Sequence, residues 1–169
     1  VPSLVNLGSI LRQMNGREAD AERHLLRVIE LEPDTILAFF NLGMLYMKVQ
    51  NGERALWAYE QARELDETHP EPWIQMMVIH RIFGDVNKSH DCAKEVLRLQ
   101  PQNATAHVIA ALSCEEKGQP AEAETHVRAA LASDPNQVQN IVSREPGLRV
   151  IIARICLLYT SPSPRDIGE

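Results

Sequence analysis

Residues 70–101, PEPWIQMMVIHRIFGDVNKSHDCAKEVLRLQP, and residues 102–135, QNATAHVIAALSCEEKGQPAEAETHVRAALASDP, decide the fold. Both stretches close on a proline, and aligning these two prolines pairs residues that lie 34 positions apart. In this alignment the glycines coincide, and small or apolar residues occupy equivalent positions. The aligned pairs are Met76 and Ala110, Gly84 and Gly118, Ser89 and Ala123, Ala93 and Val127, and Val96 and Ala130. A fixed period of this length is typical of a repeat array. The order of an apolar-periodic run, a glycine turn and a second run predicts a helix-turn-helix hairpin in tandem.

This spacing resembles the tetratricopeptide repeat, which carries Leu-Gly at positions seven and eight, an aromatic at eleven and alanines at twenty and twenty-seven. The best match without a gap is Leu42-Gly43, Tyr46, Ala55, Tyr59 and Ala62. The resemblance implies an all-α fold, a right-handed α-solenoid of about four TPR-like helix-turn-helix repeats over residues 1–135. We expect the repeats at about 1–33, 34–70, 71–101 and 102–135.

Local signals predict several boundaries of these repeats. Asn103 is expected to cap the first helix of the fourth repeat, and Gly16, Gly84 and Gly118 to turn three of the hairpins. In the second repeat the glycine is displaced to Gly52. The closing proline there arrives late, so we expect a longer connection at residues 66–69.

The repeat pattern stops after Pro135. Asn136 is expected to cap a short helix to about Arg144, and Pro146-Gly147 falls where a fifth repeat would continue. Residues 136–155 are therefore either a capping helix or the start of a further domain. Residues 156–166, CLLYTSPSPRD, resemble a translated sequencing adapter, and we treat residues 156–169 as a non-native tail.

Composition narrows the classes of partner. The 169 residues carry a formal net charge of −6, which argues against nucleic acid, and no apolar run approaches the length of a membrane span, so no membrane insertion is expected. Three cysteines are too few for a disulfide framework. A reducing compartment, cytoplasmic by default, is therefore expected.

The resemblance implies that positions two, five, six, nine, twelve and thirteen of each first helix face a concave groove. Positions five and nine form two apolar ladders, and neighbouring residues widen them. The expected partner-binding residues are Asn6, Phe40, Asn41, Met44, Met47, Ile74, Gln75, Val78, Val108, Ile109 and Leu112. An apolar surface of this kind marks an interaction site. The alternative is that these residues are ordinary core, covered by adjacent helices or by a segment from a part of the protein that this sequence does not include.

Position six carries Asn6, Asn41 and Gln75 before Ile109. In repeats of this kind an asparagine there implies contact with the backbone of an extended peptide, because an amide both donates and accepts hydrogen bonds. The alternative is a pair of solvated asparagines. No basic clamp for a terminal carboxylate exists at the matching positions, which read Val5, Ser9, Asn41, Glu71 and Gln75 for the first three repeats. Heat-shock chaperone C-terminal tails are therefore disfavoured as partners.

No cofactor, metal or catalytic motif is expected. His80 and Cys114 fall at position eleven, where the family packs an aromatic side chain, and no His or Cys pair has a familiar metal-ligand spacing. The leading interpretation is a non-enzymatic protein-protein interaction scaffold that binds an extended or amphipathic peptide segment. The alternative is the targeting or substrate-presenting region of a larger enzyme, such as a glycosyl- or sulfotransferase, and a third hypothesis is self-association through the apolar ladders.

Overall fold

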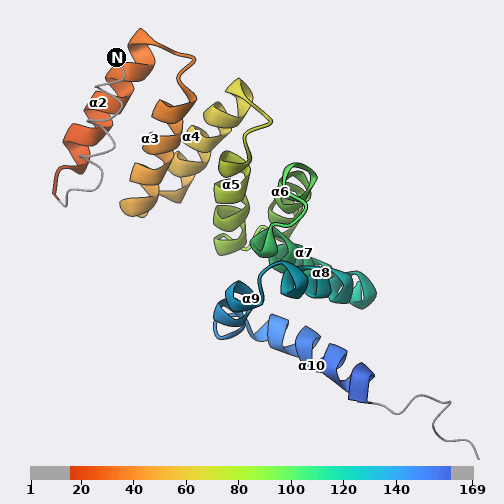
Figure 1. Cartoon of the computed structure of the whole chain (residues 1–169). Coiled ribbons are helices and arrows are strands. Elements are labelled where there is room, and N and C mark those ends of the chain that lie inside the picture. The colour runs from red at the N-terminus through yellow and green to blue at the C-terminus, as the bar shows by residue number, and fades with distance from the viewer. Residues whose placement is uncertain (1–15, 161–169) are drawn as a thin grey trace, which may run out of the picture. The chain divides into compact units, whose positions relative to one another are not determined.

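A computed structural model describes the backbone of residues 16–160 and the side chains of residues 16–156 (Figure 1). Every regular element in that part of the chain is an α-helix, which confirms the all-α prediction there. The helices are α2 (Glu18–Leu31), α3 (Ile36–Lys48), α4 (Gly52–Leu65), α5 (Pro70–Ile82), α6 (Val86–Leu99), α7 (Ala104–Glu116), α8 (Pro120–Ser133), α9 (Pro135–Val142) and α10 (Pro146–Thr160).

Side-chain caps fix where several helices begin, because they satisfy N–H groups that have no partner within the helix. Asn103 Oδ1 accepts a hydrogen bond from the backbone N–H of Ala106 at 2.9 Å, which confirms the predicted cap of α7. Asn51 and Asp85 cap α4 and α6 in the same way. Residues 66–69 connect α4 to α5, and this connection has the same length as those at residues 32–35 and 100–103, so the prediction of a longer connection is wrong.

The start of α9 differs from the prediction. Asp134 caps this helix through a hydrogen bond from the backbone N–H of Gln137, so α9 begins at Pro135. The prediction that Asn136 caps it is wrong. Proline is favoured directly after a cap, since its missing N–H would have no partner there, and the same proline that closes the fourth repeat therefore opens the next helix.

The hairpin turns share one backbone conformation. Gly16, Gly84 and Gly118 have φ angles of 84°, 76° and 71°, in the left-handed region that glycine adopts without strain. Gln50 lies at the same 34-residue interval and has a φ of 59°. The displaced glycine of the second repeat thus leaves the turn unchanged, and a glutamine adopts the left-handed conformation instead.

The chain divides into two compact units, Val1–Phe83 and Gly84–Glu169. In the first unit α3 packs on both α2 and α4, and α5 packs on α4. A Cβ atom on Gly43 of α3 would lie 2.6 Å from the ring of Tyr59 on α4, so the two helices can approach this closely only because position eight has no side chain. Large side chains complete this core, namely Leu25, Leu42, Leu45, Tyr59 and Met77.

A polar cluster connects helices α2, α3 and α4 of this unit. Tyr46 on α3 donates a hydrogen bond of 2.7 Å to Glu22 on α2, and Arg54 on α4 pairs with the same carboxylate at 3.0 Å. Burial, with Glu22 as the second cause, raises the pKa of Tyr46 to about 12. The phenol therefore stays protonated and acts as a donor across the physiological range.

In the second unit α7 packs against α6 and α8, and the two last helices pack against both α7 and α8. One apolar cluster joins these last four helices: Val108, Ala111, Leu112, Cys114, Ala123, Val127, Ala130, Val138, Leu148, Ile151 and Ile155. The apolar stretch that begins near Leu148 is thus a helix that covers α7 and α8.

Candidate interaction surface

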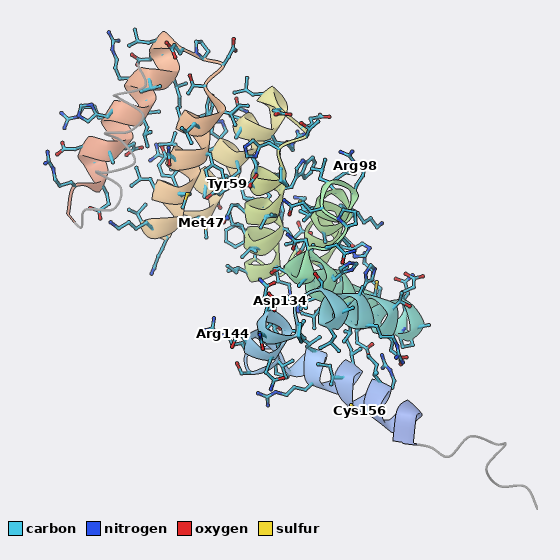
Figure 2. The ribbon with its side chains drawn as sticks, in the orientation of Figure 1. Met47, Tyr59, Arg98, Asp134, Arg144 and Cys156 are labelled. Carbon is cyan, nitrogen blue, oxygen red and sulfur yellow. The ribbon has the colours of Figure 1, made fainter. Side chains whose placement is uncertain are left out.

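Helix α3 carries apolar side chains on two sides. One side consists of Ala38, Leu42 and Leu45, which are fully or almost fully buried. The other side remains partly open to solvent and consists of Leu37, Phe40, Met44 and Met47, at the three- and four-residue spacing of one helix face. The side chain of Leu37 is 53% exposed. This second set, the α3 stripe, is not needed to complete the core (Met47 is labelled in Figure 2).

Helix α5 has a comparable stripe. Ile74 and Val78 are half-buried and Ile82 is 66% exposed, whereas Met76, Met77 and Ile79 are buried. Equal positions of successive repeats face the same side of an array. Within residues 16–156, the α3 and α5 stripes, both in the first unit, are therefore the part of the predicted binding surface that remains accessible.

The aromatic ring of Phe40 is positioned by the core beneath the α3 stripe. Its centroid lies 5.5 Å from that of Tyr59, with a tilt of 57° between the ring planes. Tilted aromatic pairs of this kind are favourable beyond the area that they bury. Tyr59 therefore supports Phe40 from the core, and the rest of the Phe40 ring is partly open to solvent. Met44 and Met47 on the same face have flexible side chains that can adapt in shape.

The side-chain amides predicted to contact a peptide backbone differ in their accessibility. Asn6 lies outside the described residues. Asn41 is only 5% exposed, so its amide is almost inaccessible to a peptide bound on α3. Gln75 on α5 is half-buried, and part of its side chain is accessible. The described amide that can meet a ligand backbone at position six is therefore Gln75.

The remaining predicted residues, Val108, Ile109 and Leu112, are buried, with exposures of 7% or less. Val108 and Leu112 belong to the cluster formed with Leu148 and Ile151 of α10. A Cβ on Gly147 would lie 3.2 Å from Leu112, so the backbone of α10 sits directly against this side chain. The structure thus corrects the expectation that these residues line an open groove.

Arg154 on α10 is a contact residue that sequence reasoning missed. Its guanidinium donates to both carboxylate oxygens of Glu115 at 2.9 and 2.8 Å, and to Glu124 on α8 at 2.6 Å. The hydrogen bonds from Arg154 lower the pKa of Glu115, and the same pairing raises the pKa of Arg154. No periodic signal could have found this pair, since its members lie 39 residues apart and Arg154 lies outside the repeats.

The described histidines and cysteines were considered as metal ligands and as nucleophiles. Within the described residues no group of three or more His, Cys, Asp or Glu side chains is arranged to hold a metal ion. Cys114 is fully buried, and burial, followed by nearby Glu122, raises the pKa of its thiol. A thiol in that setting is a poor nucleophile. His107 and His126 contact each other across α7 and α8, with their Nδ1 atoms 3.0 Å apart.

Comparison with known proteins gives a family match for part of the chain. Residues 83–138 match the model of the tetratricopeptide repeat. The crystal structure of MamA superposes with a TM-score of 0.72 over 82% of this chain and 80% of that chain, at 20% identity, which shows a shared fold. These matches confirm the predicted tetratricopeptide-repeat fold.

Two curated relatives are much longer than this chain. Human protein O-mannosyl-transferase TMTC3 is 25% identical over 116 residues, which are 68% of this chain and 13% of that protein. The DnaJ homolog subfamily C member 7 homolog of Schizosaccharomyces pombe is 32% identical over 104 residues, or 59% of this chain and 22% of that protein. This chain therefore spans less than a quarter of either relative. Among the helices described here, none has both the length and the apolar content to cross a bilayer.

Proposed function

We propose that this tetratricopeptide-repeat protein is a non-enzymatic scaffold that binds an extended or amphipathic peptide segment on the α3 and α5 stripes. The observation that supports this is the second apolar side of α3, where Leu37, Phe40, Met44 and Met47 stay partly open after the core is complete. Contiguous exposed apolar surface on a folded protein is characteristic of an interaction site. Peptide binding would cover the stripes and remove this surface from water.

The chemistry of the stripes selects an apolar partner. Position five and position nine carry Phe40 and Met44 on α3, then Ile74 and Val78 on α5, and none of these can pair with a carboxylate. Binding of a C-terminal carboxylate needs cationic donors at those places. Heat-shock chaperone tails are therefore disfavoured, and an apolar or amphipathic segment is favoured.

A second candidate function is supported by the match to TMTC3, whose name describes an O-mannosyl-transferase. In this alternative the repeats are the targeting or substrate-presenting region of a longer enzyme of the glycosyltransferase class. The complete reading frame of the source gene tests it. A catalytic domain in the same frame would support the alternative, and further repeats without one would support a stand-alone scaffold.

A pull-down with three versions of the chain tests the leading proposal. The wild type is compared with Ile74→Glu, which places a carboxylate in the α5 stripe, and with Val150→Glu, the same kind of change at a 58% exposed position of α10. Partners should be lost with Ile74→Glu and retained with Val150→Glu, at equal helix content by circular dichroism. Equal capture by both variants would place the interface elsewhere.

A further inference from the structure

In the second unit, the groove-facing side of α7 is covered by the chain itself. Its positions two, five, nine and twelve are Thr105, Val108, Leu112 and Glu115. Thr105 accepts a hydrogen bond from Gln137 on α9, and Glu115 pairs with Arg154 on α10. Val108 and Leu112 lie in the apolar cluster that includes residues of α10. A segment of this chain therefore occupies the place that a ligand would take on a repeat.

The covering helix α10 is amphipathic. Leu148, Ile151 and Ile155 are spaced three and four residues apart, and all three are buried in the cluster with α7 and α8. Val150, on the other side of α10, is 58% exposed. Apolar anchors at this spacing are the pattern by which an amphipathic helix docks in an apolar groove. The contact of α10 thus has the form of a bound helical ligand.

The face that α10 covers is acidic at its edge. Glu115 on α7 and Glu124 on α8 both bind the guanidinium of Arg154, at 2.8 and 2.6 Å. A helix that brought a neutral or acidic side chain to this place would leave two carboxylates without their cation. Opposite charge at an interface favours the matching partner, and like charge excludes the wrong one. The charge of this face therefore selects a ligand that carries a cation where α10 carries Arg154.

The position of α10 allows it to leave without opening the hairpin beneath it. It packs on α7, α8 and α9, and its outer side faces solvent (Figure 1). The last element of a repeat array has a neighbour on one side, so its local opening costs less free energy than opening of an inner hairpin. The α7–α8 hairpin keeps its own contacts, among them those of Ala111, Ala123 and Val127.

We propose that the α7–α8 face formed by Val108, Leu112, Glu115 and Glu124 is a second docking site, which binds a basic amphipathic helix and which α10 occupies as a built-in competitor. This site is separate from the α3 and α5 stripes and does not rest on the proposed function. Because a ligand binds only the fraction of molecules in which α10 has left, α10 lowers the apparent affinity of every external helix.

The test supplies the covering segment as a separate molecule. A fluorescent peptide with the sequence of residues 134–155 is added to the full chain, and binding is followed by anisotropy in 0.15 M salt, where long-range charge effects are largely screened. Protein carrying Ile151→Ala, which weakens its own α10, should bind this peptide roughly tenfold or more tightly than the wild type does. Val150→Glu, at the exposed side of α10, is the matched control and should bind like the wild type.

A second peptide, carrying Arg154→Glu, tests the charge. The Ile151→Ala protein should bind it about fivefold more weakly, the loss expected for a partly exposed ion pair. Adding Glu115→Gln and Glu124→Gln to that protein should remove the difference between the two peptides. An unchanged difference would overturn the acidic recognition, and equal affinities of the Ile151→Ala and Val150→Glu proteins would overturn the competition by α10.

Hydrogen exchange of the wild-type protein covers the case in which Ile151→Ala does not fold. A saturating amount of the first peptide should speed exchange of the α10 amides and leave those of α7 protected. Peptide binding with unchanged exchange in α10, or no binding at any concentration, would overturn the proposal. Ile74→Glu, which tests the α5 stripe, should leave this binding unchanged, so that failure at one surface is distinguishable from failure at the other.

Discussion

The His107–His126 pair leads to a prediction about pH. His107 Nε2 lies 3.0 Å from the carbonyl oxygen of Pro101, which can only accept, so this nitrogen carries a proton. In neutral His107 the other nitrogen, Nδ1, is then an acceptor. His126 Nδ1, 3.0 Å away, must donate to it. The contacts therefore assign one tautomer to each neutral ring, with the proton on Nε2 in His107 and on Nδ1 in His126.

A proton added to His126 places a cation in a partly buried site, with the centroid of the His107 ring 5.3 Å away. Burial and the neighbouring His107 accordingly lower the pKa of His126, and Glu122 on the same helix opposes them.

His90 on α6 adds to the effect, since burial, followed by Lys117 and Lys94, lowers its pKa. The charge of His126 also acts on it, while Asp91 opposes. A histidine with a lowered pKa binds protons more weakly when folded. Its stabilising contribution is complete above the unfolded value of about 6.5 and is lost as the pH falls below it. At pH 5.5 each such histidine can remove at most about 1.4 kcal/mol.

Urea unfolding at pH 7.5 and at pH 5.5 measures this loss of stability. The unfolding of the second unit is followed through NMR signals of residues in α7 and α8. The wild type should be less stable at pH 5.5, and His126→Gln should lose less between the two conditions because one of the sites no longer titrates. His24→Gln, on α2 of the other unit, serves as the control. Nitrogen-15 spectra report the tautomers directly. A His126 ring protonated at Nε2 and not at Nδ1 at pH 7.5, or an identical pH response of His126→Gln and wild type, would refute the reasoning.

Three further predictions concern stability and are measured by chemical denaturation. Gln50→Gly should stabilise the first unit by about 1 kcal/mol, because glycine adopts the φ of 59° without steric cost, and no gain would show that the turn is not strained. Gly43→Ala should cost about 1–3 kcal/mol, because the new Cβ would meet the Tyr59 ring, and a neutral result would show that the ring moves freely. Ile151→Ala should cost about 2–4 kcal/mol and speed the reaction of Cys114, in the same cluster, with a thiol reagent; unchanged reactivity would show that α10 does not shield the thiol.

The hairpins could be predicted from the sequence because their signals are local. A cap such as Asn103 acts on an N–H three residues away, and the turn glycines act on their own φ angles. Gln50 shows that residue type alone does not identify every turn position with a left-handed conformation. Each of the four described turns has a left-handed residue at this position, and the one at Gln50 was not predicted because the glycine of the second repeat lies two residues later, at Gly52. Asp134 was missed as a cap for a different reason, since the following Pro135 was assigned only the role of ending a repeat.

The accessible part of the surface could not be predicted in the same way. Periodicity places Phe40, Ile74 and Val108 at equivalent positions, and it treats them as equivalent. Whether each is open depends on segments beyond the repeat, here on α10, whose register against α7 is set by the Arg154–Glu115 pair and the apolar cluster. The same nonlocal contact makes the three positions differ in exposure. On α7 the face is filled by the chain itself, whereas Ile74 on α5 stays partly open to solvent.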